Sequence, residues 1–246
     1  MVMLILPMVL YAQPMQSKKN KNIIIFLQPL HGQSENFEKG LTHHTNTFHS
    51  NNPIDVFEVL TGEQTGQFAF VYRNLYTWTE VDEASKSAED KDHADDWNQN
   101  VAKFISNVTP RNFYEGSEDS YLPDNFKGVN TEMSAVYVID LVQGKENDFY
   151  AGVKKIKEMY KKSNSKNYYI LQTRVFGKGS QVMVVIPLEK GWASFDPSPD
   201  DDWEKMFKKA FPKEDFKAWI KSFEATQKTF DSFVVKLRKD LSSAMQ

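Results

Sequence analysis

The chain has 246 residues, of which 40% are hydrophobic and 26% are charged, and its formal net charge is −3. This balance is typical of a globular protein with a sizeable core, and it argues against a nucleic-acid partner. The sequence contains no cysteine, which excludes disulfides, thiol catalysis and cysteine metal sites.

The chain begins with an apolar segment, MVMLILPMVLYAQP. The run from Val2 to Leu10 is too short to span a bilayer as a helix, and Ala12 is small enough for a cleavage site. We therefore expect residues 1–12 to be a signal peptide and residues 13–21 a polar leader. The protein would then be periplasmic or secreted, with no stable membrane insertion after cleavage. The alternative is an apolar N-terminus that packs on the body.

Residues 22–110 predict a first β-α-β-β-α unit. Short runs rich in β-branched and aromatic residues indicate strands, turns that contain glycine indicate a hairpin, and an apolar stripe at steps of four and three indicates a helix. The unit is predicted as strand 22–30, helix 35–50, hairpin strands 54–60 and 68–72, and a helix that begins at the Asp-Asp-Trp of 95–97.

The second unit, residues 134–212, repeats this order after a polar linker at 111–133. Phe37 aligns with Phe149, Trp78 with Trp192, and Trp97 with Trp203. Five elements in the same order indicate an internal repeat. The elements are strand 134–142, helix 147–163, hairpin strands 168–176 and 182–186, and a helix at the second Asp-Asp-Trp, residues 201–203.

The last segment, residues 213–246, carries apolar residues in steps of four and three, from Phe216 to Leu241. This spacing predicts a long amphipathic helix that packs across the body. The alternative is a coiled-coil contact with a partner.

Tandem units of this kind resemble the dimeric α–β barrel superfamily, which includes antibiotic-biosynthesis-type monooxygenases and NIPSNAP-like proteins. The resemblance covers about residues 22–212 and rests on the order of the elements. It implies an α+β fold in which two ferredoxin-like antiparallel sheets face each other, with a ligand pocket between sheet and helices. It carries no set of catalytic residues.

All five histidines lie in the first half, and His44 is the candidate catalytic residue. It occupies the apolar stripe of its helix, where the second helix has Ile156. It could serve a ligand as an acid or base, or be a buried histidine with a satisfied partner. His44 and His49 are five residues apart rather than four, and no HExxH motif is present, so we expect no metal and no cofactor. His93 is expected to be solvated.

Five other residues are candidate ligand contacts. A strand arginine that faces a pocket would suit a carboxylate. The candidates are His31, Phe48, Tyr72, Arg73 and Arg174.

Three classes of function remain open from the sequence. The preferred one is an exported monomer or homodimer that binds a small apolar or aromatic ligand, or a partner, between the two sheets. The second is a cofactor-independent monooxygenase-like enzyme or another small-molecule enzyme of the barrel type. The third is a structural or interaction protein with a filled core.

Overall fold

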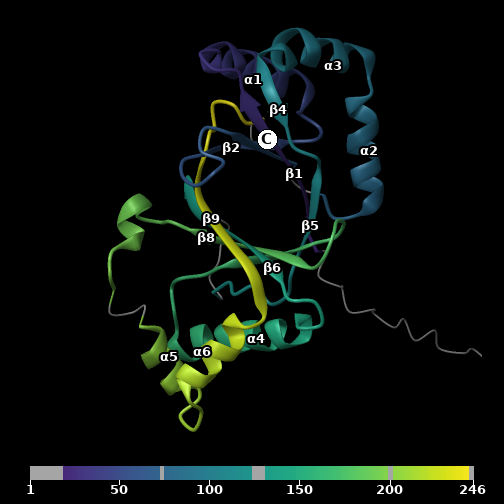
Figure 1. The fold of residues 1–246 in the computed structure, drawn as a ribbon. Coiled ribbons are helices and arrows are strands. Elements are labelled where there is room, and N and C mark those ends of the chain that lie inside the picture. The colour runs from purple at the N-terminus through teal and green to yellow at the C-terminus, as the bar shows by residue number, and fades with distance from the viewer. Residues whose placement is uncertain (1–18, 73–74, 124–130, 199–201, 244–246) are drawn as a thin grey trace, which may run out of the picture.

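A computed structural model describes residues 19–72, 75–123, 131–198 and 202–243 (Figure 1). The predicted signal peptide therefore lies outside the described residues. No described helix is long and apolar enough to cross a membrane. The strands are β1 (Lys21–Pro29), β2 (Ile54–Val59), β3 (Phe68–Tyr72), β4 (Ile105–Val108), β5 (Asn112–Gly116), β6 (Met133–Leu141), β7 (Ile170–Arg174), β8 (Gln181–Pro187) and β9 (Gln227–Leu237).

These strands form one antiparallel sheet that closes into a barrel. Its order is β3-β2-β9-β6-β8-β7-β5-β1-β4, and β1 also pairs with β3. Eight strands therefore close the barrel. The ninth, β4, pairs with β1 from Leu27 to Pro29. The expectation of two separate ferredoxin-like sheets that face each other is wrong, although the fold is α+β.

The last strand of each half pairs with one strand of its own half and one strand of the other half. β5 pairs with both β1 and β7, and β9 pairs with both β2 and β6. Each seam between the halves is thus bridged by a strand at the end of a half. The residues at 112–116, expected within a polar linker, form one of these strands.

The expectation of a long C-terminal helix is also wrong. The helix α6 (Phe216–Glu224) ends after nine residues, and β9 follows after a short turn. The segment QKTFDSFVVKL is rich in β-branched and aromatic residues, which favour strands. Its apolar residues fit helical steps by coincidence.

The interior of the barrel is packed with apolar side chains. Alternate residues of a strand face opposite sides of a sheet, so Ile24 and Phe26 point inward while Ile23 and Leu27 point outward. The interior cluster consists of Ile24, Val59, Ala69, Tyr114, Val136, Met183, Phe233 and Val235, with Phe26, Phe57, Val71, Val138 and Val185 packed against it. A ligand between the sheets, as expected from the sequence, is therefore not supported.

Helices cover the outer face of the barrel on two opposite sides (Figure 1). The first-half helices are α1 (Ser34–Phe48), α2 (Trp78–Ala88) and α3 (Lys91–Asp96), which continues into a π-helical turn, η1 (Trp97–Val101), and a 3-10 turn, η2 (Ala102–Phe104). The second half adds α4 (Glu146–Ser163), a 3-10 turn, η3 (Gly191–Phe195), α5 (Trp203–Ala210) and α6.

Two helical glycines allow close packing of these layers. A Cβ on Gly40 of α1 would lie 1.8 Å from the carbonyl oxygen of Asn100, and one on Gly152 of α4 would lie 2.2 Å from the ring of Phe223. The absence of a side chain at Gly40 thus allows the backbone of η1 to pack directly against α1.

The strand-helix-strand-strand order occurs in both halves, as β1-α1-β2-β3 and β6-α4-β7-β8. Trp78 and Trp192, which were predicted to be equivalent, do not occupy matching elements. Trp78 begins α2, whereas Trp192 lies in the short turn η3, and both are substantially exposed. Residue-by-residue equivalence of the halves is therefore not supported.

Candidate metal centre

A pocket of about 480 Å³ lies between the outer face of the first-half sheet and its helices. Its wall is mostly apolar and comes from β1, β3, the α3–η1 segment and the β4–β5 connection. The lining residues are Ile25, Leu27, His44, His49, Phe70, Tyr72, His93, Ala94, Trp97, Asn98, Val108, Thr109, Pro110 and Arg111. The volume is within the usual range for a small-molecule site.

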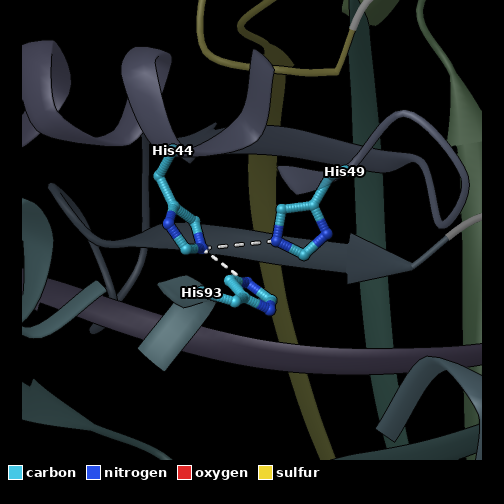
Figure 2. A group of neighbouring side chains, drawn as sticks. All are labelled: His44, His49 and His93. Atoms are coloured by element: carbon cyan, nitrogen blue, oxygen red, sulfur yellow. Dashed lines mark hydrogen bonds between the residues drawn. The ribbon is translucent and has the colours of Figure 1, made fainter. Parts of the chain in front are cut away.

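Three buried histidines that line this pocket point toward one another (Figure 2). His44, His49 and His93 are only 1%, 3% and 6% exposed. The Nε2 atom of His44 lies 3.0 Å from that of His93 and 3.4 Å from that of His49. The three available ligand atoms all lie within 4.8 Å of one another.

Local sequence signals explain how the three rings arrive at one point. His44 lies on the buried face of α1, beside Leu41 and Thr45. His49 is the first residue after α1 and caps it, so it leaves the helical path and turns back toward His44. Asp90 caps α3 by accepting hydrogen bonds from the backbone of Asp92 and His93, which fixes the position of His93.

Each ring uses its Nδ1 atom for a hydrogen bond away from the cluster. The Nδ1 atom of His44 lies 2.8 Å from a carboxylate oxygen of Asp96. That of His93 lies 2.8 Å from the carbonyl oxygen of Ser87, and that of His49 lies 3.3 Å from the carbonyl oxygen of Asn52. Carbonyl and carboxylate oxygens only accept hydrogen bonds, so Nδ1 is the protonated nitrogen in all three rings.

Three Nε2 lone pairs therefore converge when the rings are neutral. Such an arrangement is repulsive unless a cation lies between the nitrogen atoms. Two nitrogens bound to a tetrahedral zinc at about 2.05 Å would lie about 3.3 Å apart. The separations of His44 from His93 and from His49, 3.0 Å and 3.4 Å, are close to this value. All three pairs lie within 4.8 Å, so the three histidines could hold a first-row metal ion.

The protonation states also suit metal binding. Burial lowers the pKa of His44, an effect that the hydrogen bond to Asp96 only partly offsets. Burial, reinforced by the neighbouring histidines, lowers the pKa of His49 to about 3. Both rings are therefore neutral near pH 7, as a metal ligand must be.

Asp96 supports the cluster from outside the pocket. Partial burial raises the pKa of Asp96, but hydrogen bonds from His44 and Asn100 outweigh this effect and the pKa is lowered overall. One carboxylate oxygen accepts from His44, and the other accepts from the Asn100 amide at 2.6 Å and contacts His43 Nε2 at 3.2 Å. An ionised carboxylate behind a histidine fixes its tautomer and makes it a stronger ligand.

The lining of the pocket includes an exposed residue with a permanent charge, Arg111. Pro110 has no backbone N–H, and the segment 109–111 separates β4 from β5, both of which pair with β1. Arg111 is exposed at this interruption and lies near Tyr72, whose pKa is raised by burial and lowered to a smaller extent by Arg111.

The structure brings some of the predicted site residues together and separates others. His44 is in the cluster, Tyr72 lines the pocket, and the ring of Phe48 stacks on His93 at 5.0 Å. His31 is exposed in the turn after β1. Arg174 lies on β7, where its guanidinium donates to the carbonyls of Lys178 and Gly179. Arg73 lies outside the described residues.

Sequence reasoning missed His49 and His93 as partners of His44. His93 was expected to be solvated but is buried. The spacing test failed for His49 because that residue lies beyond the end of α1, where helical periodicity no longer applies. The one available signal was the concentration of all five histidines in the first half.

No protein-family model and no curated protein matches the chain. Among solved structures it is similar to a protein from Lactobacillus acidophilus NCFM described as a candidate monooxygenase, with 11% identity and a TM-score of 0.51, over 92% of this chain and 96% of the other. It is also similar to an anthrone oxidase-like protein, with 8% identity and a TM-score of 0.56, over 91% and 92%.

A third similar structure is the chlorite dismutase from Candidatus Nitrospira defluvii, with 6% identity and a TM-score of 0.52, over 90% of this chain and 93% of the other. The structural neighbours are thus monooxygenase-like and chlorite dismutase-like α+β barrels. At these identities the similarity shows the fold alone.

Proposed function

We propose that this protein is a metal-dependent enzyme that acts on a small, largely apolar molecule. His44, His49 and His93 would hold one divalent first-row metal ion at the side of the pocket. The observation that carries the proposal is the convergence of three Nε2 atoms whose rings already donate from Nδ1. This revises the expectation from the sequence that the protein has no metal and no cofactor.

The donor set points to a class of metal. Three neutral imidazoles suit zinc, copper, iron or nickel better than magnesium or calcium, which prefer oxygen ligands. Three ligands leave further positions free, as in a catalytic rather than a structural site. When bound, such an ion would polarise a substrate group or activate a small molecule such as dioxygen.

The surrounding residues favour oxidation over hydrolysis. In the part of the chain that the structure describes, the lining of the pocket holds no carboxylate that could act as a general base. Ile25, Phe70 and Trp97 would hold an apolar substrate and exclude water, while Asp96 keeps His44 oriented. The names of the neighbours, a candidate monooxygenase and an anthrone oxidase-like protein, agree with this reaction class.

The site differs from the one first expected in its location. The proposed ligand lies between sheet and helices, where the resemblance to α–β barrels placed a pocket, and not between two sheets. Export through residues 1–12 and a monomeric or homodimeric state remain proposals.

Native mass spectrometry of the purified protein tests this proposal. We expect one metal ion per chain and, in some preparations, a co-purifying small molecule. The same measurement on a variant with His44, His49 and His93 all changed to glutamine should show the metal-free mass. A wild-type protein that stays metal-free after incubation with zinc, iron and copper would overturn the proposal.

A further inference from the structure

The described lining of the pocket carries a positive charge and no negative charge. Arg111 is the only lining residue in the described chain that is charged at every physiological pH, and it has no ion pair with a described residue. Among the described residues, no acidic side chain lines the pocket and neutralises it. The carboxylate beside the histidine cluster, that of Asp96, accepts hydrogen bonds from His44 and Asn100 and contacts His43.

The backbone on both sides of Arg111 is anchored to β1. Thr109 is fixed to β1, because its backbone N–H donates to the Phe26 carbonyl at 3.0 Å and its hydroxyl accepts from the Phe26 N–H at 2.9 Å. Asn112 then begins β5 opposite Ile24. Arg111 is therefore held between two anchored points, and its exposed guanidinium is left available for a ligand.

We infer that the substrate is a small apolar carboxylate whose carboxylate pairs with Arg111 while its apolar body lies against Ile25, Phe70 and Trp97, on the way to the three histidines. A guanidinium binds a carboxylate through two parallel hydrogen bonds, and this geometry also fixes the direction of the ligand. The inference rests on the proposed metal centre only for the end of the substrate that reacts.

The size of the pocket is consistent with this class of substrate. A volume of about 480 Å³ is enough for a single aromatic ring with a short chain. A strongly hydrated molecule such as a sugar would find few hydrogen-bond partners for its hydroxyl groups on the apolar wall. A neutral apolar molecule would fit the wall but would form no charge-assisted pair with Arg111.

Calorimetric titration with a matched pair of probes tests the inference. The probes are 3-phenylpropionate and its amide, which has nearly the same shape and no charge. Wild-type protein should bind the carboxylate at least about 10-fold more tightly than the amide. In Arg111→Gln this preference should fall to near unity with amide binding unchanged. Lys166→Gln, an exposed change of the same charge in the second half, should retain the wild-type preference.

Each titration is run on zinc-loaded and on chelator-treated protein, so the two proposals can fail separately. A preference that depends on Arg111 in both forms supports the inference, even in a preparation that takes up no metal. A preference that persists in Arg111→Gln and disappears with the metal would overturn it and leave the metal centre standing. Equal affinity for the two probes, or no binding of 3-phenylpropionate to the wild type, would also overturn it.

Discussion

The Nε2 atom of His93 lies 3.0 Å from the Nε2 atom of His44, although both rings donate their Nδ1–H elsewhere. The two residues come from helices α3 and α1, 49 positions apart in the chain. A shared cation, as proposed above, would account for their approach, and most of our predictions depend on this contact.

Replacing any one of the three histidines should remove the metal. We expect His44→Gln, His49→Gln and His93→Gln each to lower metal affinity by at least about 100-fold, because losing a ligand costs no less than losing the residue that orients it. The metal content of each variant after dialysis is measured by inductively coupled plasma mass spectrometry. His31→Gln is the matched control, since His31 is exposed and is not among the residues that line the pocket. Equal metal content in all four variants would contradict this assignment.

Asp96 is expected to act through His44. Asp96→Asn keeps the shape of the side chain but replaces the carboxylate with an amide, so His44 becomes a weaker ligand. We predict a loss of about 10- to 100-fold in metal affinity, measured by competition with a chromophoric chelator. Asp95→Asn is the control, because Asp95 pairs only with Lys91 among the described ion pairs of the first half. An effect of Asp95→Asn as large as that of Asp96→Asn would argue for a general charge effect.

The metal-free protein should lose stability in mild acid. Burial lowers the pKa of His49 to about 3 and also lowers that of His44, whereas histidines in an unfolded chain titrate near pH 6.5. Between these values the unfolded chain binds more protons. The free energy of unfolding therefore falls as the pH falls from about 6.5 toward 3, by about 1.4 kcal/mol per pH unit for each proton.

Urea unfolding of the chelator-treated protein between pH 7 and 4.5 measures this dependence. His49→Leu removes one of the two titrating groups, so its unfolding free energy should decline less steeply with falling pH. Parallel curves for wild type and His49→Leu would show that His49 is not the group responsible.

The glycine at the contact between α1 and η1 should matter for both stability and metal binding. Gly40→Ala places a Cβ against the backbone of Asn100, which cannot move without shifting Asp96 and Trp97. We expect a loss of about 1–3 kcal/mol in stability and weaker metal binding. Gly152→Ala meets a side-chain ring, that of Phe223, in the other half, so it should cost less stability and leave metal affinity unchanged. Thermal melting with and without zinc distinguishes the two.

Export is tested by the mass of the mature protein. If residues 1–12 are a signal peptide, the chain expressed in a Gram-negative host should be recovered about 12 residues shorter. The intact mass of the full chain in the cytosol would count against export.

Several strands and the two long helices could be predicted from the sequence, because their patterns are local. Runs such as FAFVY and VMVVI are strands, and the stripe from Phe37 to His44 is the buried face of a helix. The order of these elements indicated an α–β barrel. Closure of the barrel could not be predicted, because it depends on pairing between distant segments such as β2 with β9.

The site was less predictable than the fold. His44 stood out because a polar residue interrupts an apolar stripe. His93 joins it only because Asp90 begins α3 and η1 packs on Gly40, and both are tertiary consequences that no spacing rule contains. Arg111 was overlooked because it lies in a segment expected to be a linker, whereas the strand arginine Arg174 is used within its own hairpin.

X-ray absorption spectroscopy of the zinc-loaded protein tests the central claim most directly. We predict a first shell with three imidazole nitrogens at about 2.0 Å, with the multiple-scattering pattern of histidine rings, completed by one lighter ligand. A first shell of oxygen atoms without imidazole scattering would contradict the assignment of His44, His49 and His93 as a metal centre.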